Sequence, residues 1–281
     1  MPLGKAIEYG ALNARCHVMR SRLIGTEALR QLTMSKSIGE VVSALSMTNY
    51  STFIKDTSVQ GVEQGVLAAF EYYREKVIHE LDKRHTGIFT LFFIKKYTLI
   101  NEKIAKISHS YTEDMFQQID RDYISSLKES MMHIHSDERR QLKKIIGSYF
   151  DLLNLYNLVK FRLLYRQTTE ETLLHMLPFA ENFTIAILSK LCSVNSLQQL
   201  SNAVEQILGN KFDDYETFRN VIYAYHRRQL LSVWSAYPFS IAIPFSILRL
   251  IEIEVSDLIA VSQGVSFGLD NKEIMTMVVG Y

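Results

Sequence analysis

Proline and glycine are scarce in this chain, and this scarcity constrains the fold more than any other feature. The 281 residues include 4 Pro and 12 Gly. A strand-rich fold of this size needs many more of both, because these residues form the turns between strands. We therefore predict an all-α protein.

Apolar residues recur at the three- and four-residue spacing of a helix face along most of the chain. The pattern predicts three long helical hairpins: 59–81 with 88–108, 113–133 with 138–166, and 215–234 with 241–263. Shorter helices between them begin with capping boxes, in which Ser, Thr or Asp is followed three residues later by Glu. These boxes open at Ser37, Thr168 and Asp270. The predicted architecture is long hairpins alternating with clusters of short helices.

The charge and the apolar stretches exclude several classes of protein. A net charge of +1 provides no overall attraction for nucleic acid. The most apolar stretch, 237–248, is shorter than the roughly 20 residues that span a bilayer, and the N-terminus has no apolar signal core. Cys16 and Cys192 lack metal-ligand spacing, which is typical of small core residues in a reducing compartment. We expect no nucleic-acid partner and no direct membrane span.

Motifs that carry chemistry are absent from the sequence. It contains no phosphate-binding glycine loop, no GxSxG nucleophile elbow and no HExxH zinc motif. His133 and His135 stand near Asp137, but two histidines two residues apart point to different sides of a helix. We interpret this segment as a polar turn. We predict no catalytic, cofactor-binding or metal-binding residues.

A short pattern repeats along the chain. Asp151 precedes Asn154 by three residues, Glu254 precedes Asp257 by the same spacing, and each pair is followed at matching distance by a capping-box helix. A weaker copy lies around Asn101. Residues three apart share a helix face, so their side chains can bond across to a neighbouring segment. We interpret these five residues as structural ties and not as catalytic acids.

Two groups of arginines are candidates for a partner interface. Arg15, Arg20 and Arg22 lie on the first predicted helix, and Arg162 and Arg166 lie near the end of the helix 138–166. One interpretation is a solvated face with favourable charge at a helix C-terminus, worth about 0.3–1 kcal/mol for each residue. The other is a surface that receives an acidic partner helix.

Several segments resemble one known family. The C-terminal segment 249–261, followed by 268–274, resembles the closing motif of the C-subunit family of archaeal and bacterial A/V-type ATPases, which corresponds to the d-subunit family of the eukaryotic vacuolar enzyme. Segment 9–24 resembles the opening Asn-Ala-Arg helix of that family, segments 97–104 and 150–171 its internal Asn-Leu motifs, and 48–50 its Thr-x-Tyr. Asp257 replaces the usual Asn, Ile259 a basic residue and Tyr156 a common Lys.

The chain is also short for this family. After Asn101 the family carries a cluster of short helices, whereas here Thr112 leads straight into the helix at Glu113. We infer an abridged second unit that breaks a quasi-threefold symmetry. The expected divisions are 1–84 (first unit), 85–136 (abridged second unit), 137–236 (third unit) and 237–281 (closing helices).

The resemblance implies a funnel-like body of three related units that acts as a socket in a rotary ATPase. A protein of this family couples the central stalk to the membrane proteolipid ring during proton or sodium transport, and it has no catalytic activity and no cofactor. Its partners would be the central-stalk subunits and the ring, and its place the cytoplasm, held at the membrane through the complex. Two alternatives stay open: a helical adaptor of unrelated role, and an enzyme with a pocket of perturbed titratable groups between hairpins.

Overall fold

The computed structural model describes residues 2–107, 113–235 and 239–280, and every regular element in these ranges is a helix. The all-α prediction is confirmed. The link from residue 108 to Thr112 and the start of the apolar stretch at 237 lie outside the described residues. By its contacts the chain divides into two compact units, 1–80 with 230–281 (unit 1) and 81–229 (unit 2). Each unit is described separately below.

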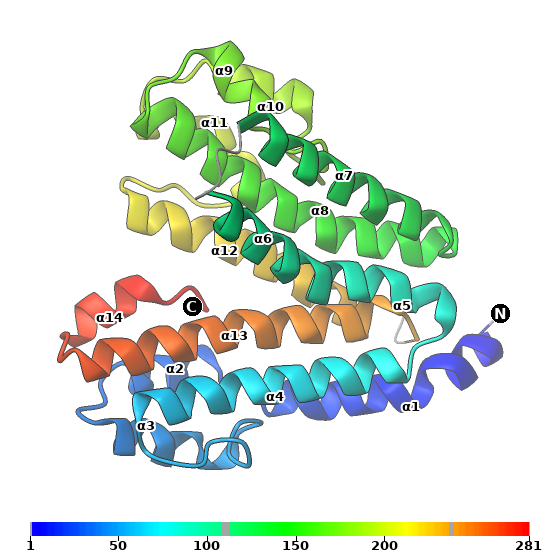
Figure 1. Ribbon diagram of the computed structural model, residues 1–281, viewed down its shortest axis with the longest axis vertical. Coiled ribbons are helices and arrows are strands. Elements are labelled where there is room, and N and C mark those ends of the chain that lie inside the picture. Colours follow the sequence, from blue (N-terminus) through cyan, green and yellow to red (C-terminus); the bar gives the residue numbers. More distant parts are fainter. Residues whose placement is uncertain (1, 108–112, 236–238, 281) are drawn as a thin grey trace. The chain divides into compact units, whose positions relative to one another are not determined.

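Unit 1 is built around α13, a helix that is buried along nearly its whole length (Figure 1). Its elements are α1 (Pro2–Ser21), α2 (Thr26–Leu32), α3 (Ile38–Ala44), the 3-10 turn η1 (Leu45–Met47), α4 (Val59–His79), the 3-10 turn η4 (Val233–Ser235), α13 (Ala242–Ser266) and α14 (Asn271–Met277). α13 contacts α4 most extensively, and also α1, α3 and α14. Because it is surrounded, even its charged Arg249 and Glu252 are buried, and they form an ion pair.

Unit 2 consists of two long hairpins and a group of short helices. Its elements are α5 (Lys83–Thr90), the π-helical turn η2 (Leu91–Lys95), α6 (Lys96–Ile107), α7 (Glu113–Met132), α8 (Ser136–Leu158), the π-helical turn η3 (Val159–Leu164), α9 (Thr169–Leu174), α10 (Ile185–Leu191), α11 (Leu197–Leu208) and α12 (Tyr215–Ser232). The helix expected from residue 88 begins earlier, at Lys83, because the Asp82 side chain caps it by accepting the Arg84 N–H at 2.8 Å.

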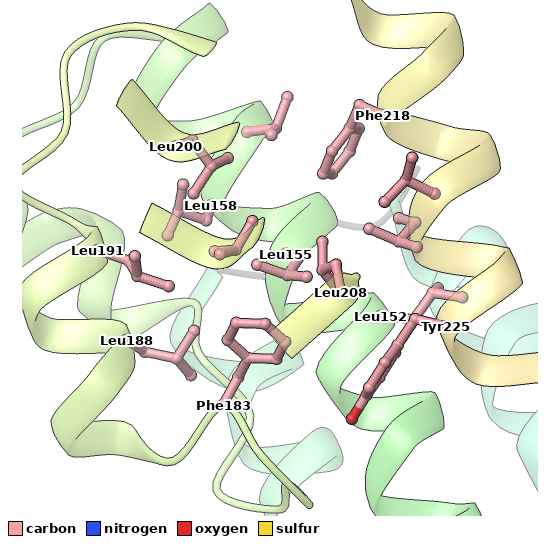
Figure 2. Close-up of a cluster of buried hydrophobic side chains, with 14 of the residues drawn as sticks. Leu152, Leu155, Leu158, Phe183, Leu188, Leu191, Leu200, Leu208, Phe218 and Tyr225 are labelled. Atoms are coloured by element: carbon pink, nitrogen blue, oxygen red, sulfur yellow. The ribbon is translucent and has the colours of Figure 1, made fainter. Parts of the chain in front are cut away.

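The core of unit 2 lies where α8, α10, α11 and α12 meet. Figure 2 shows Leu155, Leu158, Phe183, Leu200 and Phe218 converging there, and each is almost completely buried. Close packing of this kind makes truncation expensive, about 2–5 kcal/mol for a buried leucine or phenylalanine cut to alanine. The short helices are therefore fixed to α8 by apolar packing before any polar contact is considered.

No helix in the described ranges is long and apolar enough to cross a membrane.

Candidate functional site

The carboxylate of Asp151 on α8 is fully buried and accepts four hydrogen bonds. Three come from successive main-chain N–H groups, those of Glu181 (3.1 Å), Asn182 (2.9 Å) and Phe183 (3.0 Å). The fourth comes from the phenol O–H of Tyr225 on α12, at 2.6 Å. One side chain thus attaches both the loop before α10 and the helix α12 to a single point on α8.

Asn154, one turn further along α8, holds the same segment at a second point. Its Oδ1 accepts the N–H of Leu177 at 2.7 Å, and its Nδ2 donates to the carbonyl of Leu177 at 3.1 Å. Gly147 permits the close approach, since a Cβ at that position would lie 2.7 Å from the main-chain nitrogen of Glu181. Residues 177–183 therefore run along α8 with their main chain bound to its side chains.

Burial and hydrogen bonding set the charge states of this site. Burial raises the pKa of the Asp151 carboxyl above its ordinary value, while the Tyr225 phenol and the three amides oppose that rise. Burial, and then the neighbouring Asp151, raise the pKa of Tyr225 far above the usual value for a tyrosine. The phenol therefore keeps its proton and acts as a donor.

A corresponding arrangement occupies α13 in unit 1. Glu254 accepts a short hydrogen bond from the main-chain N–H of Ile24, and another from the Tyr50 phenol at 2.6 Å. Burial, followed by the charge of Glu254, raises the pKa of Tyr50 well above its usual value. Asp257, one turn later, accepts the main-chain N–H of Val279 at 2.8 Å. Both acids lie buried on α13, as Asp151 and Asn154 lie buried on α8.

The elements around the two sites also correspond. The predicted capping boxes at Thr168–Glu171 and Asp270–Glu273 are both present, at the starts of α9 and α14. The helices α2 and α10 each have 7 residues. Each is followed at the same distance by a serine, Ser37 or Ser196, that caps α3 or α11.

Side-chain contacts extend this correspondence. The Thr169 hydroxyl at the start of α9 donates to the carbonyl of Cys192, just after α10, at 3.3 Å. Asn271 at the start of α14 contacts Thr33, just after α2, where the threonine hydroxyl donates to Oδ1 at 2.5 Å. Matching positions therefore meet in the two units. The chain order differs, because in unit 1 the C-terminal α13 and α14 are joined to N-terminal segments.

Asn101, the third predicted tie, lies apart from this pattern. It is exposed on α6, and among the described residues no hydrogen bond of its side chain is found. The predicted ties lie on three helices, and the structure brings main-chain segments to the ties of two of them, α8 and α13.

The predicted arginines have different surroundings. On α1, Arg15 forms an ion pair with Glu80 at 2.6 Å, and the Arg20 guanidinium lies 4.6 Å from the centre of the Trp234 ring. Arg22, just past the end of α1, is exposed. Arg20 and Arg22 are thus both exposed near the C-terminal end of α1.

Arg162 lies in the π-helical turn η3, and its guanidinium is used within unit 2. It donates to the carbonyls of Val194 (3.1 Å) and Gln167 (2.7 Å) and to Asn195 Oδ1 (2.5 Å). Arg166 is exposed and has a positive φ of 56°, where the chain leaves η3. Arg162 therefore also connects η3 to the loop between α10 and α11.

Unit 2 contains two adjacent cavities, one of about 300 Å³ between α6, α7, η3 and the segment 174–178, and one of about 260 Å³ between α6, α7 and α8. Lys103 and Asp120 line both and form an ion pair with each other. In the described part of the chain, no group of three or more His, Cys, Asp or Glu side chains is placed to hold a metal ion. Cys16 and Cys192 are buried and unbridged.

Sequence reasoning misses the tyrosines that complete the two sites. From the sequence, Tyr225 is expected as an apolar filler between helices, and Tyr50 only as part of a Thr-x-Tyr motif. A buried phenol usually finds a hydrogen-bond partner. A tyrosine, and not a phenylalanine, at a predicted core position is therefore the one sequence signal for such a polar site. The main-chain donors cannot be identified from the sequence, since every residue other than proline has an N–H.

The sequence also matches a known protein family. A sequence model described as ATP synthase (C/AC39) subunit matches residues 12–101 and 96–277. The two matched stretches meet at residues 96–101, on α6. No curated protein matches the chain. The family consists of structural, non-catalytic subunits of V/A-type ATPases, and this chain belongs to it.

Proposed function

We propose that this protein is the socket that couples the central stalk of a rotary V/A-type ATPase to its membrane proteolipid ring. The observation that carries the proposal is the family match, which runs through both units from residue 12 to residue 277. Through that complex the protein would take part in proton or sodium transport, and it would be held in the cytoplasm at the membrane surface.

The tie sites support this role on physical grounds. A protein that transmits torque must deform little, so its short helices must be fixed to its long ones. Asp151 and Glu254 supply such attachment points in unit 2 and unit 1, through hydrogen bonds to charged groups, which contribute about 1.5–3 kcal/mol each. Salt also weakens buried attachment much less than it weakens a surface ion pair.

The basic end of α1 is our candidate for the stalk interface. Arg20 and Arg22 are exposed there, and arginine offers the fork of donors that suits a carboxylate on a partner helix. Arg15, already paired with Glu80, would contribute less. Arg166 is a further exposed candidate, whereas Arg162 would have to give up bonds within unit 2.

We also propose that the chain contains three related units arranged as a funnel, with the second abridged. The first family match ends and the second begins within residues 96–101, where the two overlap, close to the expected site of the shortening. The proposed divisions remain 1–84, 85–136, 137–236 and 237–281.

The test is reconstitution with the stalk and ring proteins of the same ATPase. We expect the chain to bind the stalk at one copy per complex, and the double change Arg20→Glu with Arg22→Glu to weaken that binding at least tenfold. Lys55→Glu, an exposed charge reversal elsewhere in unit 1, is the matched control and should leave binding unchanged. A folded chain that binds neither stalk nor ring would refute the proposal.

A further inference from the structure

The two adjacent cavities of unit 2 differ in the side chains that line them. We call the larger one, of about 300 Å³, the polar cavity, and the smaller one, of about 260 Å³, the apolar cavity. Both are lined by Lys103, Asp120, Asn157 and Leu177. Because these four residues belong to both linings, the cavities meet there, and one ligand can extend from the first into the second.

The polar cavity has an excess of positive charge. Its charged lining residues are Lys103, Asp120, Arg121 and Lys160. The first two form an ion pair, which leaves Arg121 and Lys160 without an acidic partner in the described lining. Arg121 donates to the side-chain oxygen of Gln117 at 3.2 Å, and the Lys160 ammonium lies 4.9 Å from the centre of the Phe161 ring. Neither contact neutralises a charge, so the polar cavity attracts an anion.

The apolar cavity offers mainly hydrocarbon to a ligand. Apart from the four shared residues, its lining includes Leu99, Ile100, Tyr123, Ile124, Phe150 and Leu153. It also includes Lys96, which is buried, and whose ammonium lies 4.6, 4.8 and 5.1 Å from the ring centres of Phe92, Tyr97 and Tyr149. The three rings stabilise this charge by cation–π attraction. A cationic ligand would be repelled by Lys96, whereas an alkyl chain packs against the rest of the lining.

We propose that the two cavities together bind a single-chain amphiphilic anion. Its phosphate or carboxylate head lies in the polar cavity and accepts hydrogen bonds from Arg121 and Lys160, and its alkyl chain lies in the apolar cavity. Ligand pockets in proteins usually measure about 300–1,000 Å³, and only the two cavities together fall well within that range.

The size of the apolar cavity limits the chain. If each chain carbon fills about the volume of one water molecule in the liquid, roughly 30 Å³, a cavity of 260 Å³ takes about eight carbons. The two long chains of a membrane lipid exceed this space, so the ligand has one chain. The inference uses other residues than the proposed stalk interface, and each can therefore fail without the other.

Octyl phosphate is the probe, used below the concentration at which it forms micelles. It would be titrated into the full-length chain by isothermal calorimetry, and we expect one molecule to bind to each chain. Three controls change one property at a time: inorganic phosphate lacks the chain, octanol lacks the charge, and octyltrimethylammonium reverses the charge. Each should bind at least tenfold more weakly. Equal affinities for octyl phosphate and octyltrimethylammonium would overturn the proposal, because the charge of the head would then not matter.

A charge reversal tests the head of the ligand. The double change Arg121→Glu with Lys160→Glu should weaken octyl phosphate binding at least tenfold. The matched control is Arg140→Glu with Lys190→Glu, which reverses two exposed charges elsewhere in unit 2 and should leave binding unchanged. All four side chains are exposed, so we expect every variant to fold, which circular dichroism would check. Equal weakening by both double variants would contradict a specific site, since net charge alone would explain it.

Two further measurements test the chain of the ligand. Ile100→Trp enlarges a side chain in the wall of the apolar cavity and should weaken binding at least fivefold, whereas Ile185→Trp, at a similarly exposed position on α10, should not. In NMR spectra of the complex, protons of the octyl chain should show contacts with the methyl groups of Ile124 and Leu153. Contacts confined to methyl groups outside the two cavities would overturn the proposal.

Discussion

The two buried tie sites use the same chemistry on differently connected chains. Asp151 on α8 binds main-chain groups 30 to 32 residues away, all within one loop. Glu254 on α13 binds Ile24 and Tyr50, which lie 230 and 204 residues away. The first site fixes a loop, and Tyr225 on α12 74 residues away, to the helix that precedes them, whereas the second joins the N-terminal and C-terminal segments of unit 1.

This difference has consequences for folding. Closing a longer loop costs more chain entropy, although the cost rises only slowly with length. The Asp151 site can form as soon as unit 2 begins to pack, but the Glu254 site requires the N-terminal and C-terminal segments of unit 1 to meet. We therefore expect unit 1 to depend more than unit 2 on having both ends of the chain present.

The largest expected effect comes from Asp151→Ala. The change removes the acceptor of the N–H groups of residues 181–183 and of the Tyr225 phenol, and each donor left buried without a partner, those of Phe183 and Tyr225 above all, costs about 1–3 kcal/mol. We expect the free energy of unfolding to fall by about 4 kcal/mol or more in urea titrations followed by circular dichroism. Exposed Asp213→Ala should stay within about 0.5 kcal/mol. A loss below about 2 kcal/mol for Asp151→Ala would mean that apolar packing alone fixes the loop.

The next largest effects come from removing the hydroxyl of Tyr225 or of Tyr50. Tyr225→Phe removes the donor to Asp151 and also the acceptor of Asn182 Nδ2 at 2.7 Å, while Tyr50→Phe removes the bond to Glu254. We expect about 2–3 kcal/mol of destabilisation for Tyr225→Phe and about 1–2 kcal/mol for Tyr50→Phe, measured in the same titrations. The reverse order would show that the site joining the two chain ends is the stronger one.

Local features of this fold could be predicted from sequence, and distant ones could not. The capping boxes of α9 and α14 depend on residues three positions apart, so their spacing alone predicts them. The pairs on α8 and α13 could be found because they repeat. Their partners could not, because the partners are main-chain groups brought close by the tertiary fold.

The π-helical turns illustrate a second limit. η2 lies between α5 and α6, and η3 forms the end of the helix that begins as α8, yet the apolar spacing continues through both, so the sequence predicts uninterrupted helices. From the sequence, Arg162 in η3 is therefore predicted to be an exposed basic residue near a helix end. In the structure it bonds two carbonyls and an asparagine of its own unit, and its contact with a partner stays a prediction.

A smaller effect tests the correspondence of the helix caps. Ser196→Ala and Ser37→Ala each remove a side chain that accepts a main-chain N–H at a helix start, at 3.2 Å and 3.3 Å. Each should cost about 1 kcal/mol of unfolding free energy. If the two units are equivalent here, the two losses should agree within experimental error. A neutral Ser37→Ala would indicate that α3 is held by packing and not by its cap.

The smallest effect concerns pH and the capping box of α9. Hydrogen bonds from the main chain and side chain of Thr168 lower the pKa of Glu171 below its ordinary value of 4.5. The unfolded chain therefore binds this proton more readily, and the cap stabilises α9 above pH 4.5 and loses its effect as pH falls through the folded-state pKa. Amide exchange in the first turn of α9 should speed up in that range, while Glu171→Gln should show no such step. Titration of Glu171 at or above 4.5 by NMR would contradict the cap, and would leave α9 held to α8 by the bonds of Asn154 and Asp151 to the segment that follows it.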